Sequence, residues 1–202
     1  MTALRVYDPA SRSDDRERLL RIVAASISGE PLTRSDGRTV SGYVQGHVVL
    51  GDPTALPLAA SLILDVVHQT PATVVAGEVS AACALVSAIV TLSSATPQPL
   101  VGRYVRKELK PYGLPGWLNA GLPSDSNVFL VDDVSATGAG AVRCVEVLRS
   151  LGHNVTSMMV LVDRDQGAAQ RLARLGVGLW TLFTLDEVRS AGAPLWRTAA
   201  NG

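Results

Sequence analysis

Short apolar segments alternate with segments of helical periodicity along most of the chain. From this alternation we expect strands at 73–76, 100–105, 128–131, 155–162 and 178–183, and helices at 52–67, 80–92, 140–151 and 166–175. The expected strands are apolar throughout rather than alternately polar, which is typical of strands buried on both faces. The pattern therefore predicts an α/β fold, a Rossmann-like parallel sheet flanked by helices.

The N-terminal part of the chain stands outside this alternation. An acidic start near Ser13 opens a helix with one apolar stripe, and Gly29 and Pro31 end it. Between 31 and 51, glycines interrupt every apolar run, which favours short strands and turns. We therefore expect a single domain over residues 1–202, in which residues 1–50 form a small N-terminal cap, or hood.

The junction after the strand at 128–131 carries the clearest candidate chemistry. Asp132 and Asp133 follow the apolar strand directly, and a run of small residues then leads into the next helix. Backbone N–H groups of such a run can surround a phosphate at the positive end of the helix, with the Thr137 hydroxyl as a further donor. The two acids would then face hydroxyl groups or a divalent cation of the same ligand. The alternative is a capped helix after a tight turn, without any ligand.

A basic segment contains both lysines of the chain. Arg103, Arg106, Lys107 and Lys110 precede a stretch rich in glycine and proline that reaches Pro123. A flexible loop of this composition can close cations over a highly charged leaving group such as diphosphate. The alternative is an ordinary solvated basic loop.

Three segments resemble the orotate phosphoribosyltransferases, a family of type I phosphoribosyltransferases. Segment 128–138, Val-Phe-Leu-Val-Asp-Asp-Val-Ser-Ala-Thr-Gly, resembles the type I signature for phosphoribosyl pyrophosphate. Segment 106–113 is similar to the family's catalytic loop, and segment 162–168, which contains Arg164, is similar to its base-binding strand end. The order and spacing of these segments agree with the family from about residue 32 to residue 168.

The resemblance implies transfer of ribose 5-phosphate from phosphoribosyl pyrophosphate to orotate, giving orotidine 5'-phosphate and diphosphate. It also implies a Mg²⁺ ion carried by the substrate near Asp132 and Asp133, without direct protein ligands, and a homodimer in which the basic loop reaches the neighbour's site. The implied site residues are Lys107, Lys110 and Asp133 for catalysis; Arg34, Ala136 and Arg164 for the base; and Arg106, Lys107, Lys110, Tyr112, Asp132, Asp133, Val134, Ser135, Ala136, Thr137, Gly138, Ala139 and Gly140 for phosphoribosyl pyrophosphate.

The chain departs from the family at several positions. Ala136 stands where the family has a threonine, Arg34 where it has a lysine, and Tyr112 where it has a histidine. The resemblance places a diphosphate loop at residues 77–82, which lack the family's lysine. Val44 and Gln45 replace aromatic residues that would stack on the base. Two alternatives therefore stay open. One is a phosphoribosyltransferase for a different heterocyclic base, and the other is a catalytically silent regulator that senses phosphoribosyl pyrophosphate.

Composition and charge argue against several other classes of partner. Eighteen basic residues balance 18 acidic ones, so we expect neither nucleic acid nor an anionic membrane as a partner. No apolar run is long enough to span a membrane, and the N-terminus lacks the pattern of a secretory signal, so we expect a cytoplasmic protein. The three histidines lack the spacing of metal ligands and are expected at the surface or in loops, and Cys83 and Cys144 are expected to be free, buried thiols.

Overall fold

The computed structural model describes residues 4–28, 32–33, 39–40, 42–110 and 116–192, with the backbone alone at 32–33, 39–40 and 110. The strands are β1 (Arg5–Val6), β2 (Leu32–Thr33), β3 (Thr39–Val40), β4 (Val74–Glu78), β5 (Val101–Lys110), β6 (Gly116–Leu118), β7 (Asn127–Ser135), β8 (Asn154–Asp163) and β9 (Gly178–Thr184). The helices are the 3-10 helix η1 (Ala10–Arg12) and α1 (Ser13–Ala25), α2 (Gly46–Gly51), α3 (Ala55–Val67), α4 (Cys83–Ser93), α5 (Ala139–Ser150), α6 (Ala168–Arg174) and α7 (Leu185–Ala191).

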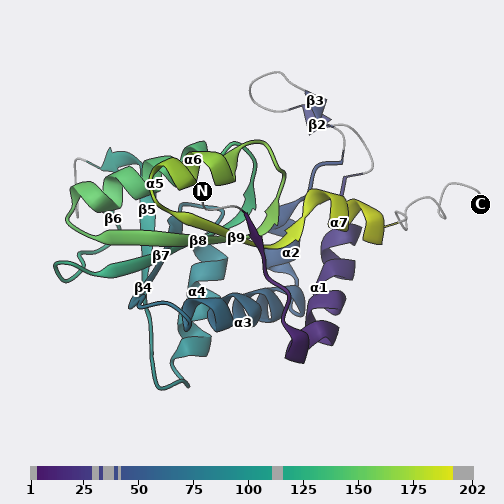
Figure 1. The fold of residues 1–202 in the computed structure, drawn as a ribbon, viewed down its shortest axis with the longest axis horizontal. Coiled ribbons are helices and arrows are strands. Elements are labelled where there is room, and N and C mark those ends of the chain that lie inside the picture. Colours follow the sequence, from purple (N-terminus) through teal and green to yellow (C-terminus); the bar gives the residue numbers. More distant parts are fainter. Residues whose placement is uncertain (1–3, 29–31, 34–38, 41, 111–115, 193–202) are drawn as a thin grey trace, which may run out of the picture.

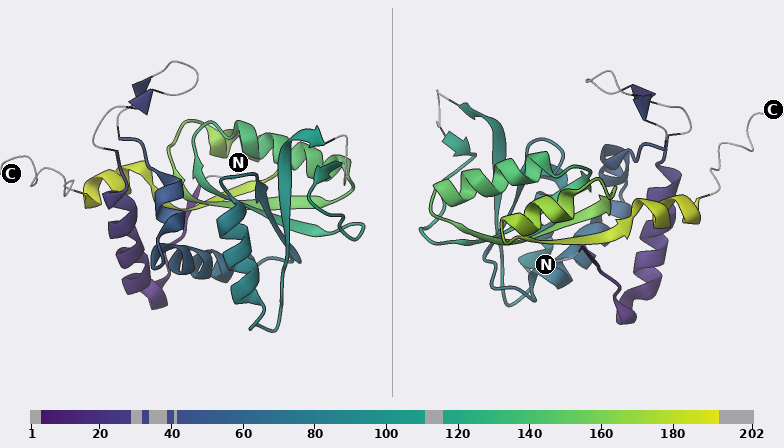
Figure 2. Two further views of the ribbon diagram at one scale, coloured as in Figure 1. Left: turned by 180° about the vertical axis from the view of Figure 1, so that it is seen from behind. Right: turned by 45° about the horizontal axis from the view of Figure 1, so that its top comes forward.

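A seven-stranded sheet forms the centre of the molecule, in the order β1-β9-β8-β7-β4-β5-β6 (Figure 1). Each pair of neighbouring strands in this sheet is parallel, apart from β5 with β6. Helices α5 and α6 cover one face and α3 and α4 the other, and the views in Figure 2 show the same two layers. The expected α/β fold, a parallel sheet flanked by helices, is confirmed.

Consecutive residues of the central strands fill two separate cores. In β7, Val128 and Leu130 pack on the side of α5 and α6, whereas Phe129 and Val131 pack on the side of α3 and α4. All four side chains are buried. Because successive side chains of a strand point to opposite faces, a strand covered on both sides needs an apolar residue at every position. The unbroken apolar runs of the sequence follow from this arrangement.

Residues 4–28 belong to the main body of the molecule. β1 extends the edge of the sheet by pairing with β9, and α1 packs against α3 and α7. β2 and β3 form a separate antiparallel pair, which lies outside this body in Figure 1. The assignment of residues 1–50 to a hood over a single domain stays a prediction.

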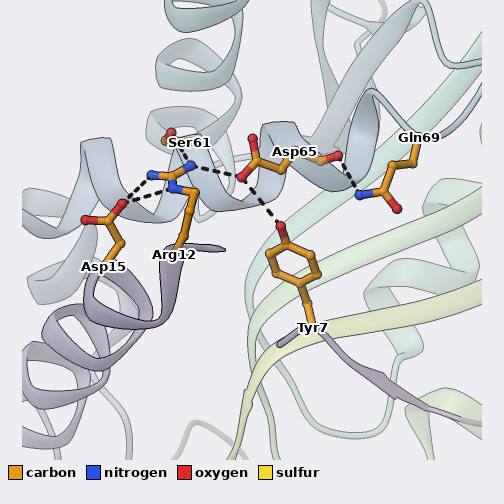
Figure 3. Close-up of polar contacts among 6 residues, drawn as sticks. All are labelled: Tyr7, Arg12, Asp15, Ser61, Asp65 and Gln69. Carbon is orange, nitrogen blue, oxygen red and sulfur yellow. Dashed lines mark hydrogen bonds and ion pairs between the residues drawn. The ribbon is translucent and has the colours of Figure 1, made fainter. Parts of the chain in front are cut away.

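A polar cluster joins the start of α1 to α3 (Figure 3). Nη1 of Arg12 donates to Oγ of Ser61 at 2.8 Å and to Oδ2 of Asp65 at 2.9 Å. The same guanidinium donates to Oδ2 of Asp15 through Nε, at 2.9 Å, and through Nη2, at 2.7 Å. One arginine therefore ties the N-terminal segment to a helix about 50 residues further along the chain.

The basic segment that we expected to be a loop is part of a β-hairpin. β5 continues to Lys110 and pairs antiparallel with β6. Nη1 of Arg106 holds the two arms together, because it donates to the carbonyl oxygens of Gly116 at 2.8 Å and of Leu118 at 2.7 Å. The loop expectation was wrong for residues 106–110, since bonds across a hairpin leave no mark in a local composition pattern.

The remaining differences are the end of β7 and three short elements that the sequence did not predict. β7 continues to Ser135, so Asp132 and Asp133 lie within the strand rather than after it. The short helices α2 and α7 and the two-residue strand β1 were not expected, because each is too short to show a period.

In the part of the chain that the structure describes, no helix is long and apolar enough to cross a membrane.

Candidate functional site

The candidate residues gather where three parallel strands end. Neighbouring strands β4, β7 and β8 run in the same direction, with Ala76 opposite Leu130 and Ser135 opposite Asp163. Their carboxyl ends therefore meet at one edge of the sheet, which is where open parallel sheets bind ligands. Glu78 ends β4, and Arg164 directly follows β8.

A loop of small residues connects β7 to α5 at this edge. Ser135 is buried at the end of the strand, and Gly138 stands at the N-cap of α5 with φ of +73°. A Cβ atom on Gly138 would lie 3.0 Å from Cα of Ala168, so both backbone conformation and space require glycine here. α5 has no side-chain cap and no acidic residue in its first turn. Its first N–H groups therefore donate to no side-chain cap and can bind an anion.

Asp132 and Asp133 are adjacent in β7 but contact different elements. Oδ2 of Asp133 lies against Gly46 of α2, where a Cβ atom would stand only 1.9 Å away. Asp132 lines a small cavity on the α5 side, together with Glu78, Gly140 and Cys144. The backbone fixes both carboxyls, because the Asp133 N–H donates to Oδ1 of Asp132 (3.0 Å) and the Val134 N–H donates to Oδ1 of Asp133 (2.7 Å).

The Asp132 carboxyl has an unusual protonation equilibrium. Its pKa is raised to about 8, first by burial and then by the negative charge of Asp133, with a smaller contribution from Glu78. In the ligand-free protein, burial and the Asp133 charge therefore favour the protonated form of this side chain, which can donate a hydrogen bond as well as accept one.

Arg164 lies beside the loop between β7 and α5. Its backbone N–H donates to the Ser135 carbonyl at 2.8 Å, and its buried guanidinium stands 5.8 Å from the centre of the Tyr43 ring. Val44, which stands where the family has an aromatic residue, is buried in the core instead of facing a ligand. Burial also raises the pKa of the neighbouring Asp163 to about 6. The structure thus brings Arg164 to the same sheet edge as the acids, as expected.

The basic residues of the hairpin differ in their exposure and contacts. Arg106 is half-buried and bonded to the second arm of the hairpin, whereas the Lys107 side chain is exposed. Lys110 is the last residue of β5, opposite Gly116, and its side chain is outside the described part of the chain. Tyr112 and Arg34 also lie outside the described residues.

Three further residues lie at this edge, and only the first belongs to a segment with an expected role. Glu78 is part of the expected diphosphate loop and comes at the end of an apolar run, as Asp132 does, so the same signal could have marked it as a candidate side chain. Arg143 pairs with Glu78 from α5, and Gly46 receives the Asp133 carboxylate. Neither of these two carries a local signal, because their partners lie far away in the sequence.

The site has little enclosed space beneath it. The cavity beside Asp132 holds only about 10 Å³, so a ligand has to lie above the strand ends. A cavity of about 360 Å³ lies elsewhere, between β6, the segment after it and the end of α5, where Trp117 and the buried His153 line it. Both cysteines are free thiols, Cys144 buried and Cys83 only half-buried.

Comparisons with known proteins agree on one family. No protein-family model matches the chain. It is 36% identical to the orotate phosphoribosyltransferase of Aeropyrum pernix over 154 residues, which are 76% of this chain and 81% of that protein. It is 31% identical to the orotate phosphoribosyltransferase of Synechocystis sp. over 177 residues, 86% of this chain and 88% of that protein.

A solved structure gives the same result for the fold. The orotate phosphoribosyltransferase of Mycobacterium tuberculosis H37Rv, in complex with Fe(III) dicitrate, superposes with a TM-score of 0.76 and 25% identity. The match covers 86% of this chain and 98% of that one. The chain therefore shares the fold of this structure over most of its length.

Proposed function

Because the chain belongs to the orotate phosphoribosyltransferase family, we propose that it transfers ribose 5-phosphate from phosphoribosyl pyrophosphate to a ring nitrogen of orotate. The products are orotidine 5'-phosphate and diphosphate, and the enzyme is a pentosyltransferase. One observation carries the proposal. Asp132 and Asp133 lie near the end of β7, and a short loop then leads to the start of α5, which has no side-chain cap, at the carboxyl edge of a parallel sheet.

The 5-phosphate of the substrate binds to residues 135–140, at the loop between β7 and α5, which we call the phosphate loop. Its oxygens accept hydrogen bonds from backbone N–H groups of residues 135–140, and the exposed Thr137 hydroxyl adds a donor. Val134 and Ala139 complete this segment without a side chain that would repel an anion. The half-buried Ala136 leaves space above the loop for the ribose and the base.

Asp132 and Asp133 bind the ribose hydroxyls, and Asp133 is the catalytic carboxylate. In the transition state, positive charge develops on the ribose as its bond to diphosphate breaks, and a fixed negative side chain stabilises that charge. The contact with Gly46 and the bond from the Val134 N–H hold Asp133 in one position. Catalysis therefore depends on a carboxylate that does not have to reorganise during the reaction.

The donor set fits a Mg²⁺ ion that arrives with the substrate. Among the described residues no group of three or more histidine, cysteine or acidic side chains could hold a metal ion. Mg²⁺ keeps several waters and is commonly bound through substrate phosphates, so Asp132 and Asp133 need only lie near the ion without ligating it directly. When bound, the ion neutralises charge on the departing diphosphate.

The basic hairpin supplies the cations for the leaving group. Lys107 and Lys110 stabilise the charge that builds on diphosphate, and Arg106 and Tyr112 bind the same group. Arg106 has a second task, since it ties the two arms of the hairpin together. As the resemblance to the family implies, we assign this hairpin to the neighbouring subunit's site in a homodimer. A cation that closes over the diphosphate also excludes water.

Arg164 orients the base, and Arg34 and Ala136 are assigned to contact with the same ring. A guanidinium can donate two parallel hydrogen bonds to a planar, anionic ring, which suits orotate. The Tyr43 ring next to Arg164 provides an apolar surface that Val44 and Gln45 do not.

The experiment that tests this proposal is the fall in orotate absorbance after mixing with phosphoribosyl pyrophosphate and Mg²⁺, beside a sample with chelator. Metal-dependent loss of orotate with release of diphosphate supports it. If orotate persists, binding of phosphoribosyl pyrophosphate by calorimetry and a panel of other heterocyclic bases separate the alternatives. Turnover of another base identifies a transferase of different specificity, and binding without turnover identifies a sensor.

A further inference from the structure

A close ion pair joins the two loops that receive the substrate. Nε of Arg143, in the second turn of α5, donates to Oε1 of Glu78 at 3.0 Å, and Nη2 contacts the same oxygen. Glu78 is the last residue of β4 and the second residue of segment 77–82, the diphosphate loop. Arg143 stands one turn after Gly140, at the end of the phosphate loop. The pair therefore spans the two anion-binding segments.

The Glu78 carboxylate lies very close to the phosphate loop. A Cβ atom on Gly140 would stand 3.2 Å from Oε2 of Glu78 and 3.8 Å from Nη2 of Arg143. The Glu78 side chain is only 15% exposed, whereas Arg143 is 42% exposed. A carboxylate in this place, beside Asp132, is poorly screened by water and would repel an incoming diphosphate.

We propose that Arg143 is a positioning residue that neutralises and holds Glu78, so that the diphosphate of phosphoribosyl pyrophosphate can bind beside this carboxylate. This inference rests on the proposed function and deepens it. The diphosphate loop lacks a lysine, and no basic residue occurs between 77 and 82. The charge that offsets Glu78 comes instead from another helix, 65 residues away in the sequence.

The shared hydrogen bonds also explain why an arginine suits this position. A guanidinium can donate from two nitrogens to one carboxylate and so fixes its orientation, which the single ammonium group of lysine does less well. The contact raises the pKa of Arg143, as expected for a cation that an acid stabilises. Arg143 acts through Glu78 and does not have to touch the substrate.

The test uses the dissociation constant of phosphoribosyl pyrophosphate, measured by calorimetry with Mg²⁺ present, and kcat measured separately. Arg143→Met exposes the Glu78 charge and is expected to weaken binding about tenfold, with a smaller change in kcat. Adding salt should reduce this defect. The double change Arg143→Met with Glu78→Gln is expected to restore binding to within about threefold of the original protein. Glu78→Gln alone should bind more tightly than the original protein.

Arg149→Met is the matched control, because it removes the same charge from the last turn of α5, where Arg149 donates to the Val155 carbonyl. Its dissociation constant should stay within about twofold of the original value. Arg143→Lys keeps the charge and should lose only a small part of the affinity.

Several outcomes overturn the inference. A double variant as weak as Arg143→Met means that Arg143 contacts the ligand itself or serves only the fold. Normal binding by Arg143→Met means that the Glu78 charge does not matter. Should Arg143→Met fail to fold, Glu78→Gln decides, because weaker binding in that variant contradicts charge neutralisation. If the original protein binds no phosphoribosyl pyrophosphate, the proposed function fails and this inference fails with it.

Discussion

The position of single side chains decides how the site works, and Asp133 is the clearest case. Its carboxylate occupies space that exists only because residue 46 has no side chain. The backbone of Gly46 is not in the left-handed region, so alanine there is compatible with the helix and would act through contact alone.

We therefore expect Gly46→Ala to displace the Asp133 carboxylate by about 1 Å or more and to lower kcat/KM at least about 100-fold. Gly51→Ala is the control, because it lies in the same helix and a Cβ atom there has nothing within 4 Å. Steady-state kinetics of both variants check the prediction. Similar kcat/KM values for Gly46→Ala and Gly51→Ala would show that the Asp133 position is not critical.

Asp132 links the site to stability through its proton. Because burial and neighbouring charges raise its pKa to about 8, the folded protein holds a proton that the unfolded chain releases above pH of about 4. The protonated side chain therefore contributes fully to the free energy of unfolding below that pH, and this contribution is lost as pH rises toward 8. Asp132→Asn replaces the carboxyl by a neutral amide, so this fall in the free energy of unfolding with pH should disappear.

We expect the melting temperature of Asp132→Asn to exceed that of the original protein by a few degrees at pH 8, and by clearly less at pH 5. Thermal unfolding without ligand at both pH values is the measurement. A difference that is constant with pH would mean that Asp132 titrates normally in the folded protein.

At the level of elements, the phosphate loop depends on the geometry between β7 and α5. Gly138 combines a left-handed backbone with close contact to Ala168 of α6, so the loop is held by a neighbouring helix as well as by its own sequence. Gly152, after α5, is also left-handed but has open space around it.

Alanine at either glycine should cost about 1–2 kcal/mol for the backbone conformation. Only Gly138→Ala also forces the loop away from α6, so we expect it to weaken binding of phosphoribosyl pyrophosphate at least about tenfold. Calorimetry on both variants, at a temperature where each is folded, tests this. Equal affinities for the two variants would contradict the assignment of the loop.

The elements that the sequence predicts are those with a strong local pattern. The apolar run at 128–131 identifies β7 because every position of a doubly covered strand is buried, and Asp132 and Asp133 stand out against that run. The hairpin of β5 and β6 was not predicted, because Arg106 stabilises it through bonds to Gly116 and Leu118, which lie on the other arm. α2 was missed because a helix bounded by Gly46 and Gly51 has no visible period.

At the scale of the whole molecule, contacts between distant segments complete both the fold and the site. Gly46 and Asp133 come from different parts of the chain, as do Glu78 and Arg143, and no local pattern records such pairs. The Arg12 cluster in Figure 3 does the same for the N-terminal segment, which it fixes to α3.

We expect Arg12→Met to lower the free energy of unfolding by about 1–3 kcal/mol, because Asp65 and Ser61 lose a charged partner in a half-buried position. The kcat at 25 °C should change little. Arg21→Met is the control, since its pair with Glu17 is largely exposed and should contribute less than about 1 kcal/mol. Urea unfolding of both variants is the measurement, and equal loss in the two would mean that the cluster adds nothing to stability.

The most direct test of the site is a crystal structure of the protein with phosphoribosyl pyrophosphate bound. We expect the 5-phosphate to bind to the backbone N–H groups of residues 135–140 and the ribose hydroxyls to bind to Asp132 and Asp133. The diphosphate should lie toward the end of β4. Substrate bound elsewhere, for example in the cavity beside Trp117 and His153, would contradict the assignment of the site.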